Sequence, residues 1–88
     1  MFYVYVLQSQ LDQGLYIGYT GNLRRRLFEH NTGEARATSF RRPWKLIYYV
    51  AYLIEEDAMR RERFLKSGAG RRHIDKQLRR YFERHPRA

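Results

Sequence analysis

The sequence of 88 residues contains no cysteine. This absence excludes disulfide cross-links and thiolate metal sites, so the folded chain has to rely on an aromatic and aliphatic core. It also fits a reducing compartment, and we expect a cytoplasmic protein. No apolar run approaches the ~20 residues of a membrane-spanning helix, and the N-terminus lacks the basic segment and cleavage site of a signal peptide. We therefore expect no membrane partner.

Several catalytic motifs are missing as well. The chain has no His-Glu-x-x-His pair, no glycine-rich phosphate loop ending in Lys-Ser or Lys-Thr, and no Gly-x-Ser-x-Gly elbow. These absences argue against zincin, P-loop and serine hydrolase chemistry.

Acidic residues are scarce: nine stand against 18 basic ones, which gives a formal net charge of +9. Fifteen of the basic residues are arginine, whose planar fork matches phosphate oxygens. Residues 60–88 carry eleven basic and three acidic groups, whereas residues 1–59 carry seven and six. A basic end of this kind indicates nucleic-acid binding, with an anionic membrane surface, an acidic protein or a merely solubilising surface as alternatives.

The chain is expected to form a single domain, 1–88, because its length buries too little surface for two cores. Hydrophobic periodicity and turn residues predict an α+β fold of order ββαβαα, a small three-stranded antiparallel sheet flanked by helices. The predicted strands are residues 2–7, 15–20 and 44–53, and the predicted helices are about residues 23–31, 55–67 and 71–84. The third strand is expected to be well buried, Gly68 to end the second helix, and residues 32–43 to form a polar loop.

Alternation along the first two strands places tyrosines together. Tyr3 and Tyr5 lie on one face of the first predicted strand of the hairpin. On the second strand, Tyr16 and Gly18 lie together on one face. Tyr19 points to the opposite face and is expected to belong to the core. One hairpin face is therefore rich in hydroxyl groups.

Glu62 is the strongest anomaly in the pattern, because it lies in the core-facing row Ala58, Glu62, Leu65 of a predicted helix. Burying a carboxylate is costly unless it is paired or binds a cation. One interpretation is an ion pair with Lys66, one turn further on, or with Arg26. The other is a ligand for a hard divalent cation, for which one glutamate with water and substrate phosphate suffices.

Arg26 and His30 lie one turn apart on the first predicted helix, where both border its leucine row. This spacing places them at the edge of the core. The other histidines, His73 on the basic final helix and His85 near the C-terminus, are expected to be exposed to solvent.

The segments "YVYVLQS" and "YIGYTGNLRRRLFEHN" resemble the two signature halves of the GIY-YIG nuclease superfamily. The resemblance continues through Arg26 and His30 to Glu62 in "AMRRERFLK" and covers about residues 2–66. The chain is most similar to small stand-alone bacterial members, related to the amino-terminal nuclease domain of the bacterial excinuclease. It departs from the family pattern in having Tyr3 where the first motif has glycine, and in having no asparagine downstream of Glu62.

The resemblance implies a GIY-YIG-like fold and hydrolysis of DNA phosphodiester bonds with one Mg²⁺ or Mn²⁺ ion on Glu62. It implies that the catalytic residues are Tyr5, Tyr16, Arg26, His30 and Glu62, with Tyr5 as the candidate general base. Because tyrosine has a pKa near ~10, nearby cations and hydrogen bonds from Tyr16 or His30 are expected to stabilise its phenolate. Arg26 is expected to neutralise the scissile phosphate.

We therefore expect a structure-directed endonuclease of DNA repair or recombination, acting on branched or damaged DNA as a monomer or weak homodimer. The alternative is a non-catalytic module that retains the nuclease fold and binds DNA or RNA. In both cases the basic C-terminal helix, about 71–84, supplies phosphate contacts. The residues expected to bind nucleic acid are Gly18, Arg25, Arg41, Arg42, Arg71, Arg72, Arg79 and Arg80.

Overall fold

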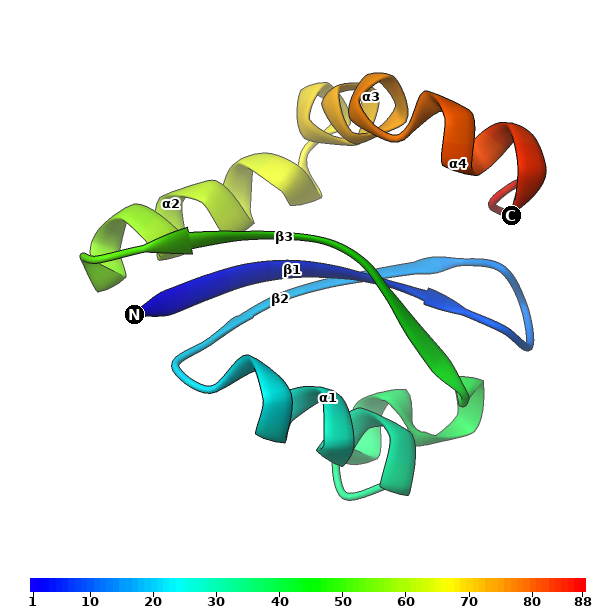
Figure 1. Ribbon diagram of the computed structural model, residues 1–88, viewed down its shortest axis with the longest axis horizontal. Coiled ribbons are helices and arrows are strands. Elements are labelled where there is room, and N and C mark those ends of the chain that lie inside the picture. Colours follow the sequence, from blue (N-terminus) through cyan, green and yellow to red (C-terminus); the bar gives the residue numbers. More distant parts are fainter.

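A three-stranded antiparallel sheet forms the centre of the structure (Figure 1). The computed structural model describes all 88 residues. The strands are β1 (Phe2–Ser9), β2 (Leu15–Thr20) and β3 (Trp44–Tyr52), and their order in the sheet is β2-β1-β3. The central strand β1 is buried from Val4 to its end, as expected of a strand with neighbours on both sides.

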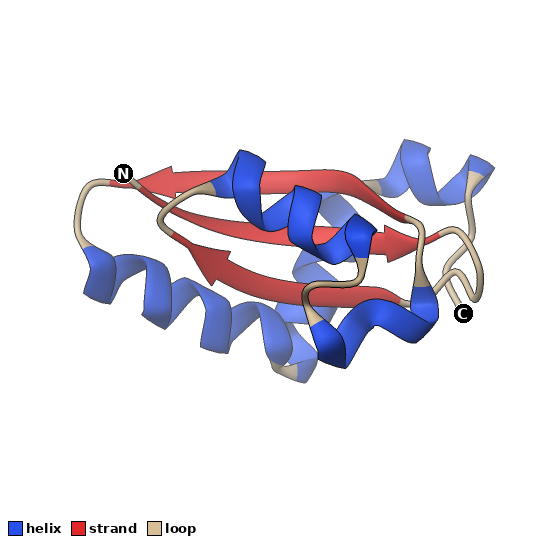
Figure 2. Cartoon of the chain, turned by 90° about the horizontal axis from the view of Figure 1, so that it is seen from below, coloured by secondary structure: helices blue, strands red, loops and turns tan.

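Helices cover both faces of this sheet (Figures 1 and 2). One face carries α1 (Leu23–Thr32) and the short 3₁₀ helix η1 (Arg36–Arg41). The other face carries α2 (Glu55–Lys66), α3 (Gly68–Gln77) and α4 (Arg79–Arg84). The predicted fold class is confirmed. None of the helices combines the length and the apolar character needed to cross a bilayer.

The two faces bury different parts of the hairpin, as the alternation predicts. The core on the side of α2 and α3 consists of Val4, Val6, Leu15, Ile17, Ala58, Leu65 and Ile74. The smaller core on the side of α1 consists of Tyr5, Leu7 and Trp44. Tyr19 packs against the α2 side, so its predicted place in the core is confirmed.

Local signals in the sequence fix both ends of α1. The side chain of Asn22 accepts a hydrogen bond from the backbone N–H of Arg25 at 3.0 Å and caps the N-terminus. Gly33 ends the helix in the left-handed conformation, with φ at 88°. The predicted helix is therefore confirmed to within one residue at its end.

The prediction that the third strand is well buried is wrong. β3 lies at an edge of the sheet, and the side chains of Lys45 and Tyr49 are exposed. An aromatic and β-branched composition indicates a strand but does not say whether a second neighbour will cover it. The sheet order decides this, since it gives the central position to β1.

The prediction of one continuous helix over 71–84 is also wrong. α3 begins at Gly68, where Ser67 caps it by accepting a hydrogen bond from the Gly70 N–H at 3.1 Å, so Gly68 is not the residue that ends α2. The helix then breaks at Leu78. Beyond the break, the Tyr81 hydroxyl donates a hydrogen bond of 2.6 Å to the buried amide oxygen of Gln8 in β1. A tertiary contact thus sets the direction of α4.

Residues 32–43, predicted as a polar loop, contain η1. Contacts with distant residues hold this segment in place. The backbone N–H of Trp44 donates to the Asn31 side chain at 2.6 Å, and Nε of Arg41 donates to Asp12 at 2.7 Å. The hydrogen bond from Arg41 lowers the pKa of Asp12 to about 2. Such contacts leave no periodic pattern in the sequence. For this reason the sequence predicted no helix in these residues.

Candidate active site

The side chain of Tyr5 lies between the sheet and α1, at the centre of the candidate site. Tyr5 pairs with Gly18 of β2 in the antiparallel register. A Cβ atom added to Gly18 would lie 2.6 Å from the Tyr5 hydroxyl oxygen and 2.8 Å from Cζ. The space above Gly18, which the sequence interpretation assigned to the substrate, is therefore filled by the Tyr5 ring. Glycine is required here because Tyr5 crosses directly over the neighbouring strand.

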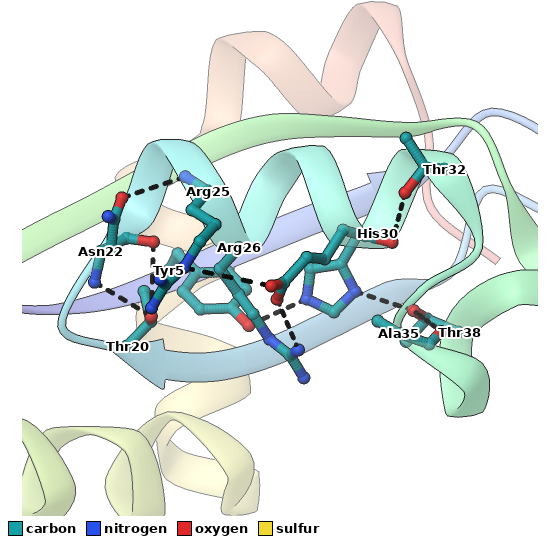
Figure 3. A network of polar contacts seen from close by, with 10 residues as sticks. Tyr5, Thr20, Asn22, Arg25, Arg26, His30, Thr32, Ala35 and Thr38 are labelled. Atoms are coloured by element: carbon teal, nitrogen blue, oxygen red, sulfur yellow. Dashed lines mark hydrogen bonds and ion pairs between the residues drawn. The ribbon is translucent and has the colours of Figure 1, made fainter.

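A chain of hydrogen bonds runs from Tyr5 through His30 to Thr38 of η1 (Figure 3). The Tyr5 hydroxyl lies 2.9 Å from Nε2 of His30, and Nδ1 of His30 lies 2.7 Å from the Thr38 hydroxyl. Thr38 donates its single hydroxyl proton to the carbonyl oxygen of Ala35, 3.1 Å away. Thr38 can therefore only accept from Nδ1–H, which assigns the proton of neutral His30 to Nδ1. Nε2 is left as an acceptor for the Tyr5 hydroxyl.

Burial keeps both members of the Tyr5–His30 pair neutral. Burial raises the pKa of Tyr5 to about 12, although the adjacent Arg26 lowers it. Burial, reinforced by the charge of Arg26, lowers the pKa of His30 to about 4. The expectation of a stabilised phenolate on Tyr5 is therefore wrong for the free protein, because the cost of removing the charge from water outweighs the attraction of one arginine.

The low pKa of His30 predicts that stability falls in mild acid. The folded chain keeps His30 neutral to about pH 4, whereas the unfolded chain protonates it near its ordinary value of 6.5. The unfolded state then binds more protons as the pH falls, so the free energy of unfolding should drop by about 2 kcal/mol between pH 7 and pH 5. Urea denaturation at both pH values measures this drop. His30→Gln should show a smaller decrease, and an equal decrease in both proteins would contradict the assignment.

Arg26 brings a positive charge to the Tyr5 hydroxyl from α1 (Figure 3). Its Nη1 donates a hydrogen bond of 3.0 Å to Glu29, three residues further along the helix. This hydrogen bond raises the pKa of Arg26, so the guanidinium is charged throughout the accessible pH range. Its side chain is 37% exposed and can therefore meet a ligand from solvent. Glu29 holds one end of the guanidinium, and the group also interacts with the Tyr5 hydroxyl.

Tyr16 contributes its ring to the same site. The ring centroid lies 5.0 Å from that of His30 and 6.1 Å from that of Trp44, both in edge-on or tilted contacts. Tyr16 also lines an open pocket of about 390 Å³ between α1 and η1, together with Arg26 and His30. The hydroxyl of Tyr5 is thus hydrogen-bonded to His30, and Tyr16 packs the imidazole in place.

Glu62 lies on α2, which covers the other face of the sheet (Figure 1). Its side chain is 19% exposed and pairs with Nζ of Lys66 at 3.0 Å, so the structure contains the first of the two ion pairs considered from sequence. Arg26 pairs with Glu29 instead. The charge of Glu62 nevertheless contributes to raising the pKa of Tyr5, which places the carboxylate within electrostatic reach of the hydroxyl.

The surroundings of Glu62 fit a divalent cation of the Mg²⁺ type. No group of three or more His, Cys, Asp or Glu side chains is arranged to hold a metal. The single carboxylate is bonded only to Lys66, whose side chain is 52% exposed and can move aside. Mg²⁺ commonly takes one or two carboxylates and completes its shell with water and substrate phosphate. Glu62 therefore suffices as the protein ligand of such an ion.

The arginines predicted to bind nucleic acid do not all lie near this site. Arg25 is exposed on α1, and Arg42 follows η1 on the same side of the sheet. Arg41 is engaged by Asp12 and lies over the Trp44 ring at 4.8 Å, so its guanidinium holds the hairpin turn.

The C-terminal arginines occupy the opposite side of the sheet. They belong to α3 and α4, whose apolar residues pack with Val4 and Val6 rather than with Tyr5. The structure thus brings Tyr5, Tyr16, Arg26 and His30 together on the α1 side, whereas Glu62 on α2 is linked to them only by its charge. Four of the predicted phosphate contacts lie away from this cluster. Those four residues are Arg71, Arg72, Arg79 and Arg80.

Sequence reasoning missed two residues that position the site. Glu29 orients Arg26, and its spacing of three residues on a helix is a signal that was available. Thr38 fixes the protonation of His30, but it lies in a segment without periodicity, eight residues away. Nothing in the sequence indicates that this threonine is buried.

Known proteins resemble the chain over most of its length. Residues 1–75 match the family described as the GIY-YIG catalytic domain. A UPF0213 protein of Streptococcus pneumoniae serotype 4 is 48% identical over 65 residues, which are 73% of this chain and 65% of that protein. A UPF0213 protein of Pediococcus acidilactici is 47% identical over 68 residues, which are 74% of this chain and 68% of that protein.

A third relative, UPF0213 protein SAG0778 of Streptococcus agalactiae serotype V, is 46% identical over 65 residues, or 73% of each chain. The matched region thus spans 65% to 73% of the length of these three relatives. No solved structure matches the chain significantly.

Proposed function

The chain belongs to the GIY-YIG family of catalytic domains, and from this premise we propose that it is a divalent-metal-dependent endonuclease that hydrolyses DNA phosphodiester bonds. The observation that carries the proposal is the contact of 2.9 Å between the Tyr5 hydroxyl and Nε2 of His30. This contact supplies a proton acceptor beside the cationic side chain of Arg26. The carboxylate of Glu62 on α2 is the group that suits a metal ion.

Nucleic acid is the substrate that suits the charge of the molecule. The net charge of +9 and the predominance of arginine favour a polyanion rich in phosphate. Contacts with phosphate carry no sequence information, so an enzyme that relies on them discriminates by the shape of its substrate. We therefore propose that the substrate is branched, nicked or damaged DNA, as in repair or recombination.

The hydrogen-bond chain defines a path for the proton of the attacking water. The water gives a proton to the Tyr5 oxygen while the Tyr5 hydroxyl proton passes to Nε2 of His30. The water oxygen forms the new bond to phosphorus, and the bond from phosphorus to the leaving oxygen breaks, with its electron pair going to that oxygen. His30 becomes an imidazolium whose Nδ1–H remains bonded to Thr38. A concerted transfer avoids a free phenolate, which the pKa of about 12 disfavours.

Arg26 and Glu62 complete the proposed mechanism. The guanidinium of Arg26 binds the scissile phosphate and offsets the negative charge that develops on it. The phosphate charge also favours protonation of His30, whose low pKa is partly due to Arg26. Glu62 would hold the divalent ion once Lys66 releases it, and a bound ion supplies Lewis-acid stabilisation of the leaving oxygen.

The proposal is tested by measuring metal binding and cleavage with the same protein. The wild type should cut flapped or nicked duplexes in Mg²⁺ or Mn²⁺ and should not cut them with EDTA. In calorimetry with DNA present, Glu62→Gln should lose Mg²⁺ binding, whereas Lys66→Gln should bind Mg²⁺ more tightly because it removes the competing ammonium. Glu56→Gln, an exposed carboxylate on the same helix, is the matched control.

One result would contradict the role of Glu62, and another would contradict the nuclease assignment. Unchanged Mg²⁺ binding in Glu62→Gln would move the metal site elsewhere. DNA binding by the wild type with neither metal binding nor cleavage would favour the non-catalytic module.

A further inference from the structure

A second hollow lies beside α1, on the side away from the candidate active site. The active site is bounded by α1 and β2, whereas this groove is bounded by α1 and β3. The groove is open and has a volume of about 470 Å³. Leu23 and Leu27 of α1 and Leu46 of β3 line its floor, and Arg24 stands at its rim. We call it the aromatic groove because of its remaining wall.

That wall consists of two tyrosines from neighbouring strands. Tyr3 of β1 and Tyr49 of β3 meet edge to face, with ring centroids 6.2 Å apart and planes at 61°. Tyr49 is 54% exposed, although an aromatic ring of this size normally contributes most to stability when it is buried. The protein therefore leaves an aromatic face available to solvent in a groove with an apolar floor.

We infer that the aromatic groove binds an unpaired nucleobase of the DNA strand that enters the candidate active site. This inference rests on the proposed function and narrows its substrate to DNA with a single-stranded segment next to the cut. Bases stack on exposed aromatic rings regardless of sequence, and an arginine at the rim meets the phosphate that follows. No acidic side chain lines the groove, so nothing in it repels a polyanion.

The register of the sheet brings the groove within reach of the site. Tyr3 and Tyr5 are alternate residues on the same face of β1, about 7 Å apart along the strand. Tyr49 pairs with Tyr5 across the strands. A strand whose phosphate meets Arg26 can therefore place a neighbouring base against Tyr49 by passing the N-terminus of α1.

A second copy of the chain is the less suitable occupant. Each molecule carries a net charge of +9, so two copies repel each other, and the groove offers no carboxylate to offset that repulsion. Nucleic acid has the complementary charge. The groove and the basic surface thus favour the same partner.

Binding assays in EDTA test the inference without cleavage. Tyr49→Ala should bind a single-stranded oligonucleotide at least about fivefold more weakly than the wild type, because one stacked base is lost. Its affinity for a blunt duplex and the salt dependence of binding should not change, since no phosphate contact is removed. Tyr49→Phe should match the wild type, and Tyr49→Leu should resemble Tyr49→Ala. Phe40→Ala removes an aromatic ring that is 87% exposed outside the groove and serves as the matched control.

The remaining outcomes separate a failure of the groove inference from a failure of the proposed function. Unchanged single-strand affinity in both Tyr49→Ala and Tyr49→Leu would overturn the inference, as would equal losses for single strand and duplex. A dimeric wild type that becomes monomeric in Tyr49→Ala would assign the groove to a second copy. If the wild type cleaves DNA while Tyr49→Ala binds single strands normally, only the groove inference fails. If the wild type binds no DNA at low salt, the proposed function fails with it.

Discussion

Tyr5→Phe is expected to lower the rate of DNA cleavage by about 10²–10⁴-fold, the range that a positioned proton-transfer group contributes. The substitution removes only the hydroxyl group that relays a proton from the attacking water to Nε2 of His30. The ring remains over Gly18, so the packing of the site is preserved. The variant should therefore lose catalysis while it retains DNA and metal binding.

Single-turnover cleavage of a nicked or flapped duplex measures this effect. Tyr3→Phe is the matched control, because Tyr3 lies on the same face of the same strand and its hydroxyl takes no part in the chain to His30. Tyr5→Phe also leaves Nε2 of His30 buried without a donor, which should cost about 1–3 kcal/mol of stability. The assay is therefore run well below the unfolding temperature of the variant. Cleavage by Tyr5→Phe within threefold of the wild type would rule out Tyr5 as the proton relay.

Gly70→Ala is expected to reduce the free energy of unfolding by about 3 kcal/mol or more, the upper end of what overpacking costs. Gly70 is buried where α3 turns back against α2. An added Cβ would overlap the carbonyl oxygen of Phe64 and would lie 2.5 Å from Cα of Leu65. Both are backbone atoms of α2, so relief requires the two helices to separate.

Gly68→Ala provides the control for this prediction. Gly68 is also in α3, but an added Cβ would meet only the tip of Arg72 at 3.5 Å, an ordinary contact. Alanine favours a helix over glycine by up to ~1 kcal/mol, so Gly68→Ala should be neutral or slightly stabilising. Thermal and urea unfolding of both variants separate the two effects. Equal stability of Gly70→Ala and Gly68→Ala would mean that α3 does not pack against α2 as described.

The sequence by itself determined the three strands and the first two α-helices of this fold, and the identity of its candidate site. Alternation placed Tyr5 and Tyr19 on opposite faces of the hairpin, and Asn22 and Gly33 marked the ends of α1, because these signals act within a few residues. Glu62 stood out for the same reason, as a carboxylate in an apolar row of one helix. The resemblance to the GIY-YIG motifs then connected these residues into one candidate site.

The tertiary structure alone decided the protonation and the surroundings of that site. Thr38 fixes the proton on His30, and burial gives Tyr5 a pKa of about 12 where the sequence suggested a stabilised phenolate. Likewise, the aromatic sequence of β3 did not reveal that it lies at an edge, where Tyr49 remains exposed. The desolvation of Tyr5, the tautomer of His30 and the position of β3 in the sheet each depend on residues from several segments that are distant in the sequence. Local patterns cannot report them, because they arise only when those segments have packed together.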